Sequence, residues 1–419
     1  MDASRNLARR PPGGAVRNGP PSPMGLDGSR FTPAERRKAA VGRGTAIFAV
    51  LAIAALCGAC ASRPESGYLA PVATAAPGAS DLTVLIASTR ERDPRPGTLY
   101  NGERSGSIDY AMATVSIPPN HVAGAIEWGS VAPGDPNTNF VVRQESYLDS
   151  DAQFLRELNA QLARRPAGSR KVILFVHGYN TMFAEGLYRF AQVVHDAQSS
   201  ATPVFFSWAS RGQLSQYVYD TNSATAARDA LEHTIRLLFA SNADQVNILA
   251  HSMGNWVTVE ALRQIKISES LPHVGKLGLV ILAAPDIDLD VFKSEMRRFG
   301  KPKKPFYIVL SRDDRALALS NFIAGGQSRL GDYANSKELA AMGAVVIDLS
   351  ELKGGDAANH DKFAQLAVVA PQLGPILASG IRGDADAADE SRRTIGGGLG
   401  NIIMRPLVLL GAPIEIVGE

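Results

Sequence analysis

Short apolar runs alternate with amphipathic stretches along most of this 419-residue chain, and this alternation constrains the fold more than any other feature. The runs have the length of buried strands, and the stretches between them have helical periodicity. Strands that are apolar on both faces occur in parallel sheets covered by helices on both sides. The sequence therefore predicts an α/β fold with a mostly parallel sheet and helices on both faces. We expect strands at Leu82–Ala87, Val172–Val176, Val204–Trp208, Val246–Ala250, Leu279–Ala283, Phe306–Leu310 and Ala344–Leu349, an antiparallel strand at Met112–Ile117, and helices at Ala152–Arg164, Phe183–Gln198, Ala224–Ala240, Asn255–Ile265 and Asn359–Val368.

Changes in composition divide the chain into four parts. Residues 1–60 form an N-terminal extension, 61–80 a linker, 81–375 one α/β domain and 376–419 a C-terminal tail. The end of the tail, Ile402–Val417, is apolar. It either packs on the domain or contacts lipid.

A basic cluster followed by an apolar run near the N-terminus is typical of an export signal. The run Thr45–Ala59 has 15 residues, fewer than the ~20 that span a bilayer. Small residues before Cys60 resemble the lipobox of bacterial lipoproteins, which implies cleavage before Cys60 and acylation of its thiol. Cys57 stands where that motif usually has Leu, so an uncleaved signal anchor is the alternative. Either way we expect export to the cell envelope, with the body attached to the membrane and facing the periplasm.

The stretch Val246–Val257 predicts a catalytic nucleophile. A buried strand runs into Ala250-His251-Ser252-Met253-Gly254, and a helix follows. This pattern is typical of a nucleophile elbow, in which a tight turn needs small residues two before and two after the serine. A serine at a helix N-cap is the structural alternative. We interpret Ser252 as the nucleophile.

A nucleophilic serine needs a base, and the chain has seven histidines. In the fold that carries such elbows, the order along the chain is serine, acid, histidine. Only His273 and His360 follow Ser252, and His273 comes too early, just before a strand. His360 follows the last expected strand, so we predict that it is the base.

Two acidic loops can supply the acid that orients the histidine. Asp314 follows the strand Phe306–Leu310, the usual position of the acid. Its neighbour Asp313 is interpreted as a solvated residue paired with a nearby arginine. Asp286, which follows the preceding strand, is the alternative acid.

An ester hydrolase also needs two donors for the oxyanion. The backbone N–H of Met253, directly after the nucleophile, is one candidate. The second is expected in the turn after Val172–Val176, where we assign Tyr179, with Asn180 as the alternative. The side chain of His177 in this turn is interpreted as structural.

Other classes of function have no support in the sequence. Lysine and arginine total 43 and aspartate and glutamate 41, a net charge of +2 that predicts no nucleic-acid partner. Both cysteines lie before residue 61, so cysteine-ligated zinc and a cysteine nucleophile are excluded from the body. No cluster has metal-ligand spacing, and we expect no metal and no cofactor.

Fragments spread over Asp81–Phe363 together resemble a bacterial α/β-hydrolase family of unknown function, often labelled esterase/lipase superfamily. The resemblance implies the α/β-hydrolase fold and a nucleophile at Ser252, but no particular substrate. The tail lies outside it, and Ala209 departs from the proline expected there. The matching fragments are Ala87-Ser88-Thr89-Arg90, Val115-Ser116-Ile117-Pro118-Pro119-Asn120-His121, Phe175-Val176-His177-Gly178-Tyr179-Asn180, Phe206-Ser207-Trp208, Tyr219-Asp220, Leu249-Ala250-His251-Ser252-Met253-Gly254, Ala284-Pro285-Asp286 and Asp314-Arg315-Ala316-Leu317.

Two functions from different classes fit these features. The first is a serine hydrolase that cleaves carboxylic esters or thioesters of a small molecule or lipid, with an acyltransferase as a close variant. The second is a non-catalytic envelope lipoprotein that uses the fold as a binding scaffold, because fold alone does not determine function. A complete serine, acid and histidine set favours the first.

Overall fold

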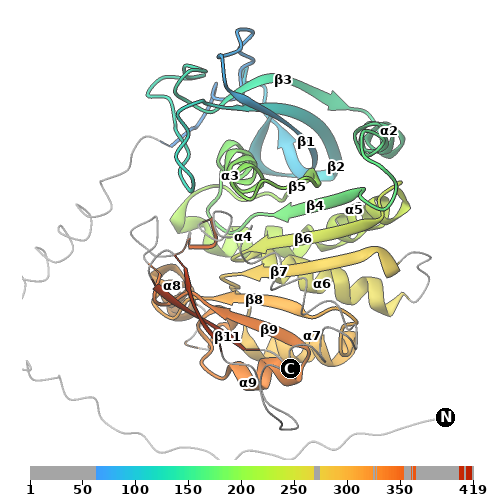
Figure 1. Ribbon diagram of the computed structural model, residues 1–419, viewed down its shortest axis with the longest axis vertical. Helices are drawn as coiled ribbons and strands as arrows, with labels where there is room; N and C mark the ends of the chain where they lie inside the picture. Colours follow the sequence, from blue (N-terminus) through green and yellow to red (C-terminus); the bar gives the residue numbers. More distant parts are fainter. Residues whose placement is uncertain are drawn as a thin grey trace, which may run out of the picture. The chain divides into compact units, whose positions relative to one another are not determined.

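The computed structural model describes residues 63–268, 274–323, 326, 328–352, 360, 362–364, 405–409 and 412–417. The described strands form one sheet of eleven, in the order β10-β11-β9-β8-β7-β6-β4-β5-β1-β2-β3. Figure 1 shows them stacked from β3 at the top to β9 near the bottom. The strands are β1 (Ser80–Arg92), β2 (Tyr100–Ile117), β3 (Val141–Leu148), β4 (Lys171–Val176), β5 (Thr202–Ser207), β6 (Gln245–His251), β7 (Leu277–Ala283), β8 (Phe306–Leu310), β9 (Ala344–Asp348), β10 (Arg405–Leu409) and β11 (Ala412–Val417).

The centre of the sheet is parallel and both of its ends are antiparallel. Every neighbouring pair from β1 through β5, β4, β6, β7 and β8 to β9 is parallel. β2 and β3 at one end, and β11 and β10 at the other, continue the sheet with antiparallel pairs. The α/β fold with a mostly parallel sheet is thus confirmed.

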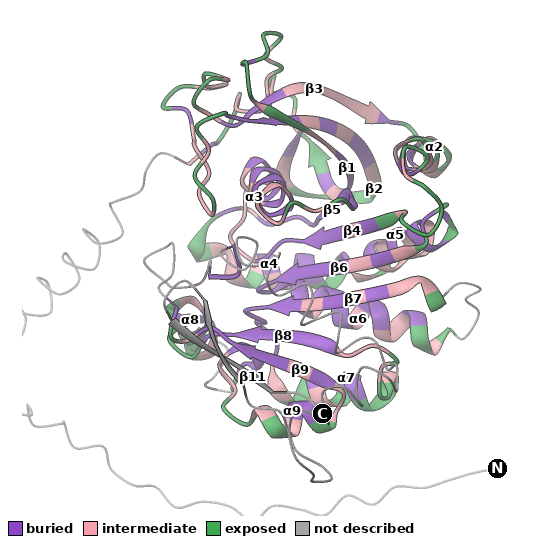
Figure 2. Cartoon of the chain, in the orientation of Figure 1, coloured by how far each residue is buried: buried purple, intermediate pink, exposed green. Residues whose placement is uncertain are grey.

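Helices cover both faces of the sheet, because each central strand is apolar on both sides. In β5, Val204 and Phe206 join one hydrophobic core while Phe205, between them, joins the other. Figure 2 shows the central strands as largely buried. The first core includes side chains of α2 (Asp151–Leu162), α5 (Arg228–Ala240), α6 (Gly254–Ile267), α7 (Leu289–Phe299) and α9 (Ser336–Ala341), and the second includes those of α3 (Phe183–Asp196).

Several elements differ from the sequence-based expectation. The expected helix Ala224–Ala240 is two helices, α4 (Tyr217–Ala226) and α5, which meet at Ala227. β3, α7, α8 (Arg315–Ile323) and α9 were not expected. Of the expected helix Asn359–Val368, the structure describes a helical turn at 362–364.

Two segments expected outside the domain are part of the packed body. In the expected linker 61–80, Leu69 is fully buried, and Val72 donates its N–H to the Val142 carbonyl. Buried backbone groups need hydrogen-bond partners, so this segment is fixed rather than a free tether. In the tail, β11 pairs with β9, so its end joins the sheet edge, which is one of the two alternatives considered.

Candidate functional site

The turn between β6 and α6 has the geometry of a nucleophile elbow. β6 ends at His251, α6 begins at Gly254, and Ser252 between them has a φ of 52°. A positive φ is strained for a residue with a side chain, and such strain concentrates at functional sites. The turn holds Ser252 at the carboxyl edge of the parallel strands, at the N-terminus of a helix whose dipole favours negative charge.

Two glycines let the segments around Ser252 pack closely. A Cβ atom on Gly254 would lie 2.3 Å from the carbonyl oxygen of His177. A Cβ atom on Gly178 would lie 2.6 Å from Cβ of Ser252. Because both distances are too short for real side chains, the elbow and the turn after β4 can contact only through glycine at these positions.

The backbone of Ser252 is tied to the next strand and loop. Its N–H donates to the Ala283 carbonyl at 3.0 Å, and its carbonyl accepts the N–H of Asp286 at 3.2 Å. The Asn255 amide group donates to the carbonyls of both Ser252 and Ala283, each at 2.8 Å. These bonds hold the strained turn in one conformation.

The structure brings together the predicted base and the predicted acid. Nδ1 of His360 lies 2.7 Å from Oδ2 of Asp314, whose side chain is fully buried. The other oxygen, Oδ1, accepts the N–H groups of Ala316 and Leu317 at 2.9 and 3.0 Å. Asp314 is therefore held from one side by the start of α8 and presents its second oxygen to the histidine.

The other two acidic candidates have different partners. Oδ1 of Asp286 accepts the Ser320 hydroxyl at 2.6 Å and lies 3.3 Å from Nε of Arg329. Asp313 pairs with Lys362 at 2.6 Å. Arg312, next to it, forms an ion pair with Asp348.

His251 connects the elbow to the histidine loop. Its ring centroid lies 4.6 Å from that of His360 and 4.1 Å from that of Phe363, on which it stacks. Burial, and then the charge of His360, keep the pKa of His251 well below its ordinary value, so its ring is neutral. The sequence reasoning assigned no function to His251. This residue directly precedes Ser252, and its ring packs against the ring of His360.

The turn after β4 contains both candidates for the second oxyanion donor. The N–H of Asn180 donates to Oδ2 of Asp220 at 3.1 Å, so it is committed elsewhere. Tyr179 directly follows Gly178, which packs against Ser252, and its hydroxyl donates to the Leu214 carbonyl. This geometry favours Tyr179 over Asn180.

His177 is a buried structural residue. Its Nδ1 lies 2.8 Å from the Gly178 carbonyl oxygen, and its ring stacks on Trp208 with centroids 4.9 Å apart. Burial, followed by the nearby charge of Arg90, lowers its pKa well below the ordinary value. A ring that stays neutral and buried can shape the turn without exchanging protons.

Sequence reasoning missed two buried charged residues near this turn. Arg90 is 1% exposed and Asp220 is fully buried. Both lie in fragments that carried the family resemblance, which was the available signal, but nothing in the sequence alone indicated what they contact.

Some other expectations concern metals, membranes and the N-terminus. In the described part of the chain, no group of three or more His, Cys, Asp or Glu side chains is arranged to hold a metal ion. No helix among the described residues is long and apolar enough to cross a bilayer. Cys60 and the apolar run before it lie outside the described residues.

A comparison with protein-family models agrees with the fold. The model of a family described as alpha/beta hydrolase of unknown function (DUF900) matches residues 150–376, which is more than half of the chain. The chain belongs to this family. The matched region of this alpha/beta hydrolase contains Ser252, Asp314 and His360, but not β1, β2 or β3. A search of curated proteins found no match to the chain.

Proposed function

We propose that this alpha/beta hydrolase is a serine hydrolase that cleaves carboxylic esters or thioesters through an acyl-enzyme on Ser252. Oγ of Ser252 attacks the ester carbonyl carbon while His360 accepts the hydroxyl proton, which gives a tetrahedral oxyanion. The amides of Met253 and Tyr179 stabilise that oxyanion. When the intermediate collapses, the leaving alcohol or thiol takes the proton from His360. Water, deprotonated by His360, then releases the acid and restores the serine.

The observation that supports this proposal most is the contact between Asp314 and His360. A carboxylate on Nδ1 selects the tautomer whose Nε2 is unprotonated, which is the form that acts as a base. The same carboxylate stabilises the imidazolium that forms during attack. A histidine that only capped a helix would not need a buried carboxylate held by two backbone amides.

The conformation of Ser252 supports the same proposal. The residue is 4% exposed and has a positive φ, in a turn whose close packing requires glycine at 254 and, in the turn after β4, at 178. A serine that only capped the helix would adopt an unstrained extended backbone. The strain therefore favours a nucleophile over a cap.

Labelling with a fluorophosphonate probe, which reacts with activated serines, tests the proposal. Wild type should label and Ser252→Ala should not. Ser268→Ala, which alters a serine at the other end of α6, should label like wild type. With p-nitrophenyl esters, Ser252→Ala should retain only the ~10³–10⁴-fold acceleration over water that binding and the oxyanion donors supply.

A folded wild-type protein that neither labels nor hydrolyses any ester would contradict the proposal and favour the scaffold function. A panel of p-nitrophenyl esters of increasing chain length, with matching thioesters, defines the acyl group. Adding alcohol acceptors to the same assay distinguishes hydrolysis from acyl transfer, because a transferase forms a new ester instead of free acid.

We also propose that the protein is exported and attached to the cell envelope through Cys60 or through its apolar run. The sequence supports this proposal, because small residues precede Cys60 and a basic cluster precedes the apolar run. Inhibiting signal peptidase II in expressing cells should accumulate a precursor. Absence of a precursor, with the protein still in the membrane fraction, would identify an uncleaved anchor instead.

A further inference from the structure

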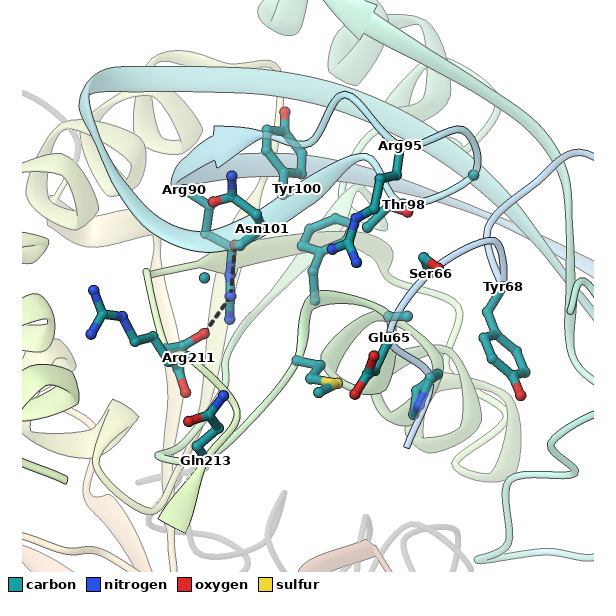
Figure 3. A pocket seen from close by; sticks show the side chains of 17 residues that line it. Glu65, Ser66, Tyr68, Arg90, Arg95, Thr98, Tyr100, Asn101, Arg211 and Gln213 are labelled. Carbon is teal, nitrogen blue, oxygen red and sulfur yellow. Dashed lines mark hydrogen bonds between the residues drawn. The ribbon is translucent and has the colours of Figure 1, made fainter. Parts of the chain in front are cut away.

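Arg90 is a buried arginine whose side chain connects four segments of the protein. It lies on β1, outside the region matched by the family, and is 1% exposed. Figure 3 shows it on one wall of a pocket of about 260 Å³, close to Asn101 and to the segment that carries Arg211. Its polar contacts are Nε to Ser207 Oγ at 2.8 Å, Nη1 to the Asn101 carbonyl at 3.1 Å and the Ser210 carbonyl at 2.7 Å, and Nη2 to the Thr181 carbonyl at 2.9 Å and His177 Nε2 at 3.3 Å.

Asp220 on α4 provides acceptors where Arg90 provides donors. Its Oδ2 accepts the N–H of Asn180 at 3.1 Å and the hydroxyl of Ser210 at 2.6 Å. Its Oδ1 accepts the N–H of Arg211 at 3.0 Å. Arg90 and Asp220 thus hold the same two turns, the one after β4 and the one after β5.

The contacts to the turn after β4 are made by two consecutive residues, Asn180 and Thr181. Asp220 holds the N–H of Asn180, and Arg90 holds the carbonyl of Thr181. The preceding peptide joins Gly178, which packs against Ser252, to Tyr179, the candidate oxyanion donor. The orientation of the Tyr179 amide therefore depends on two contacts that fix the residues immediately after it.

Burying these charges is costly, so stability alone does not explain them. Burial lowers the pKa of Arg90 to about 10 and raises the pKa of Asp220, so it disfavours the charged form of both groups. Well-packed apolar residues commonly match or exceed the stability of a buried charged pair. Apolar residues cannot, however, fix the rotation of a peptide plane. The planar guanidinium group of an arginine can, because it holds five N–H donors in a rigid arrangement.

We propose that Arg90 and Asp220 are positioning residues that orient the turn 177–182 so that the Tyr179 amide points at the oxyanion formed on Ser252. This inference rests on the proposed serine hydrolase function. It assigns a task in that site to β1, which lies outside the matched family region. Arg90 and Asp220 act through the turn and do not touch the reacting atoms.

The variants Arg90→Lys and Asp220→Asn test the proposal in the full-length protein. Lysine keeps the charge but offers three donors instead of five, and Asn places an amide group against an N–H or a hydroxyl. We expect kcat to fall about 10²-fold, as for a misplaced or lost oxyanion donor, with KM changed less than about threefold. Inhibition by an aryl boronic acid, whose serine adduct is tetrahedral, should weaken by the same factor as kcat/KM.

The matched control is Arg92→Lys, on the same strand. Arg92 forms a bidentate pair with Asp109 that is partly exposed and does not involve the turn after β4. Arg92→Lys also removes a bidentate guanidinium group from β1. A general loss of stability in β1 would therefore appear in this variant too. We expect its kcat, KM and boronate inhibition to equal those of wild type.

Hydrogen–deuterium exchange separates this inference from the function on which it rests. The amides of 177–182 should exchange faster in Arg90→Lys and Asp220→Asn than in wild type or Arg92→Lys. If wild type proves unreactive, the serine hydrolase function fails while the exchange data still report on the turn. Unchanged exchange, or a loss of activity that only follows the unfolded fraction in either variant, would overturn the positioning role. If Arg90→Lys does not fold, Asp220→Asn alone decides.

Discussion

The carboxyl edge of the sheet and the interface between α6 and α7 both bury carboxyl groups, but they surround them differently. At the edge, Asp314 and Asp286 accept hydrogen bonds from amides, hydroxyls or cationic groups. Between the helices, Glu295 is 3% exposed, and neither of its oxygens accepts a hydrogen bond from a donor group among the described residues. Its close neighbour is another carboxyl group, Glu260.

This difference shows what keeps a buried carboxyl group charged. Donors compensate the lost hydration of a carboxylate, so the edge can bury carboxylates next to the turn that carries Ser252. Without them, burial first, and then the neighbouring Glu260, raise the pKa of Glu295 to about 9. Glu295 is therefore protonated at neutral pH, and its proton can bond to Glu260, which two ionised carboxylates could not do.

The largest expected effect is from Asp314→Asn. Asn can place an N–H toward His360 and select the wrong tautomer, so kcat on a p-nitrophenyl ester should fall about 10⁴-fold. The control is Asp313→Asn, which changes the adjacent, half-exposed carboxylate that pairs with Lys362. Its kcat should stay within a few-fold of wild type. Equal losses in both variants would show that kcat falls because the loop after β8 is disturbed, and not because His360 loses its carboxylate.

The next effect is on stability, from Glu295→Gln. Between pH ~4.5 and 9 the unfolded chain releases the Glu295 proton while the folded protein keeps it, so folding becomes less favourable as the pH rises. The free energy of unfolding should then fall by up to about 1.4 kcal/mol per pH unit in wild type from this group. Urea unfolding at several pH values should show a shallower fall in Glu295→Gln.

An exposed carboxyl group on β1 provides the control for that measurement. Glu91→Gln should leave the pH dependence as in wild type. If Glu295→Gln is less stable than wild type at pH 8, Glu295 is ionised in the folded protein, and the contrast between the two regions does not hold.

The smallest expected effect on catalysis is from Asp286→Asn. Its carboxylate binds Ser320 and Arg329, while Asp314 is the acid that contacts the histidine, so kcat should change less than about tenfold. Breaking these buried contacts should lower the free energy of unfolding by about 1–3 kcal/mol, which chemical denaturation measures. A 10⁴-fold loss here, with Asp314→Asn active, would make Asp286 the acid.

Features that depend on short stretches were predictable from the sequence. The central strands and the strand-turn-helix arrangement around Ser252 follow from local patterns of apolar, small and turn-forming residues. The contact between Asp314 and His360 was anticipated because the order of serine, acid and histidine that is usual in this fold leaves few candidates. Asn180 and Tyr179 could not be separated in this way, since only the contact between Asn180 and Asp220 distinguishes them.

Local sequence determines which residues can form a strand, a helix or a strained turn, because backbone preferences and apolar periodicity act over a few neighbours. It therefore determined the class of fold and the candidate nucleophile of this protein. Tertiary structure alone decided that Leu69 of the expected linker is core, that no described residue donates to Glu295, and that Arg90 reaches the turn after β4. These outcomes depend on which groups from distant segments come into contact. The same contacts decide whether a buried group can carry a charge, because a buried charge needs hydrogen-bond partners.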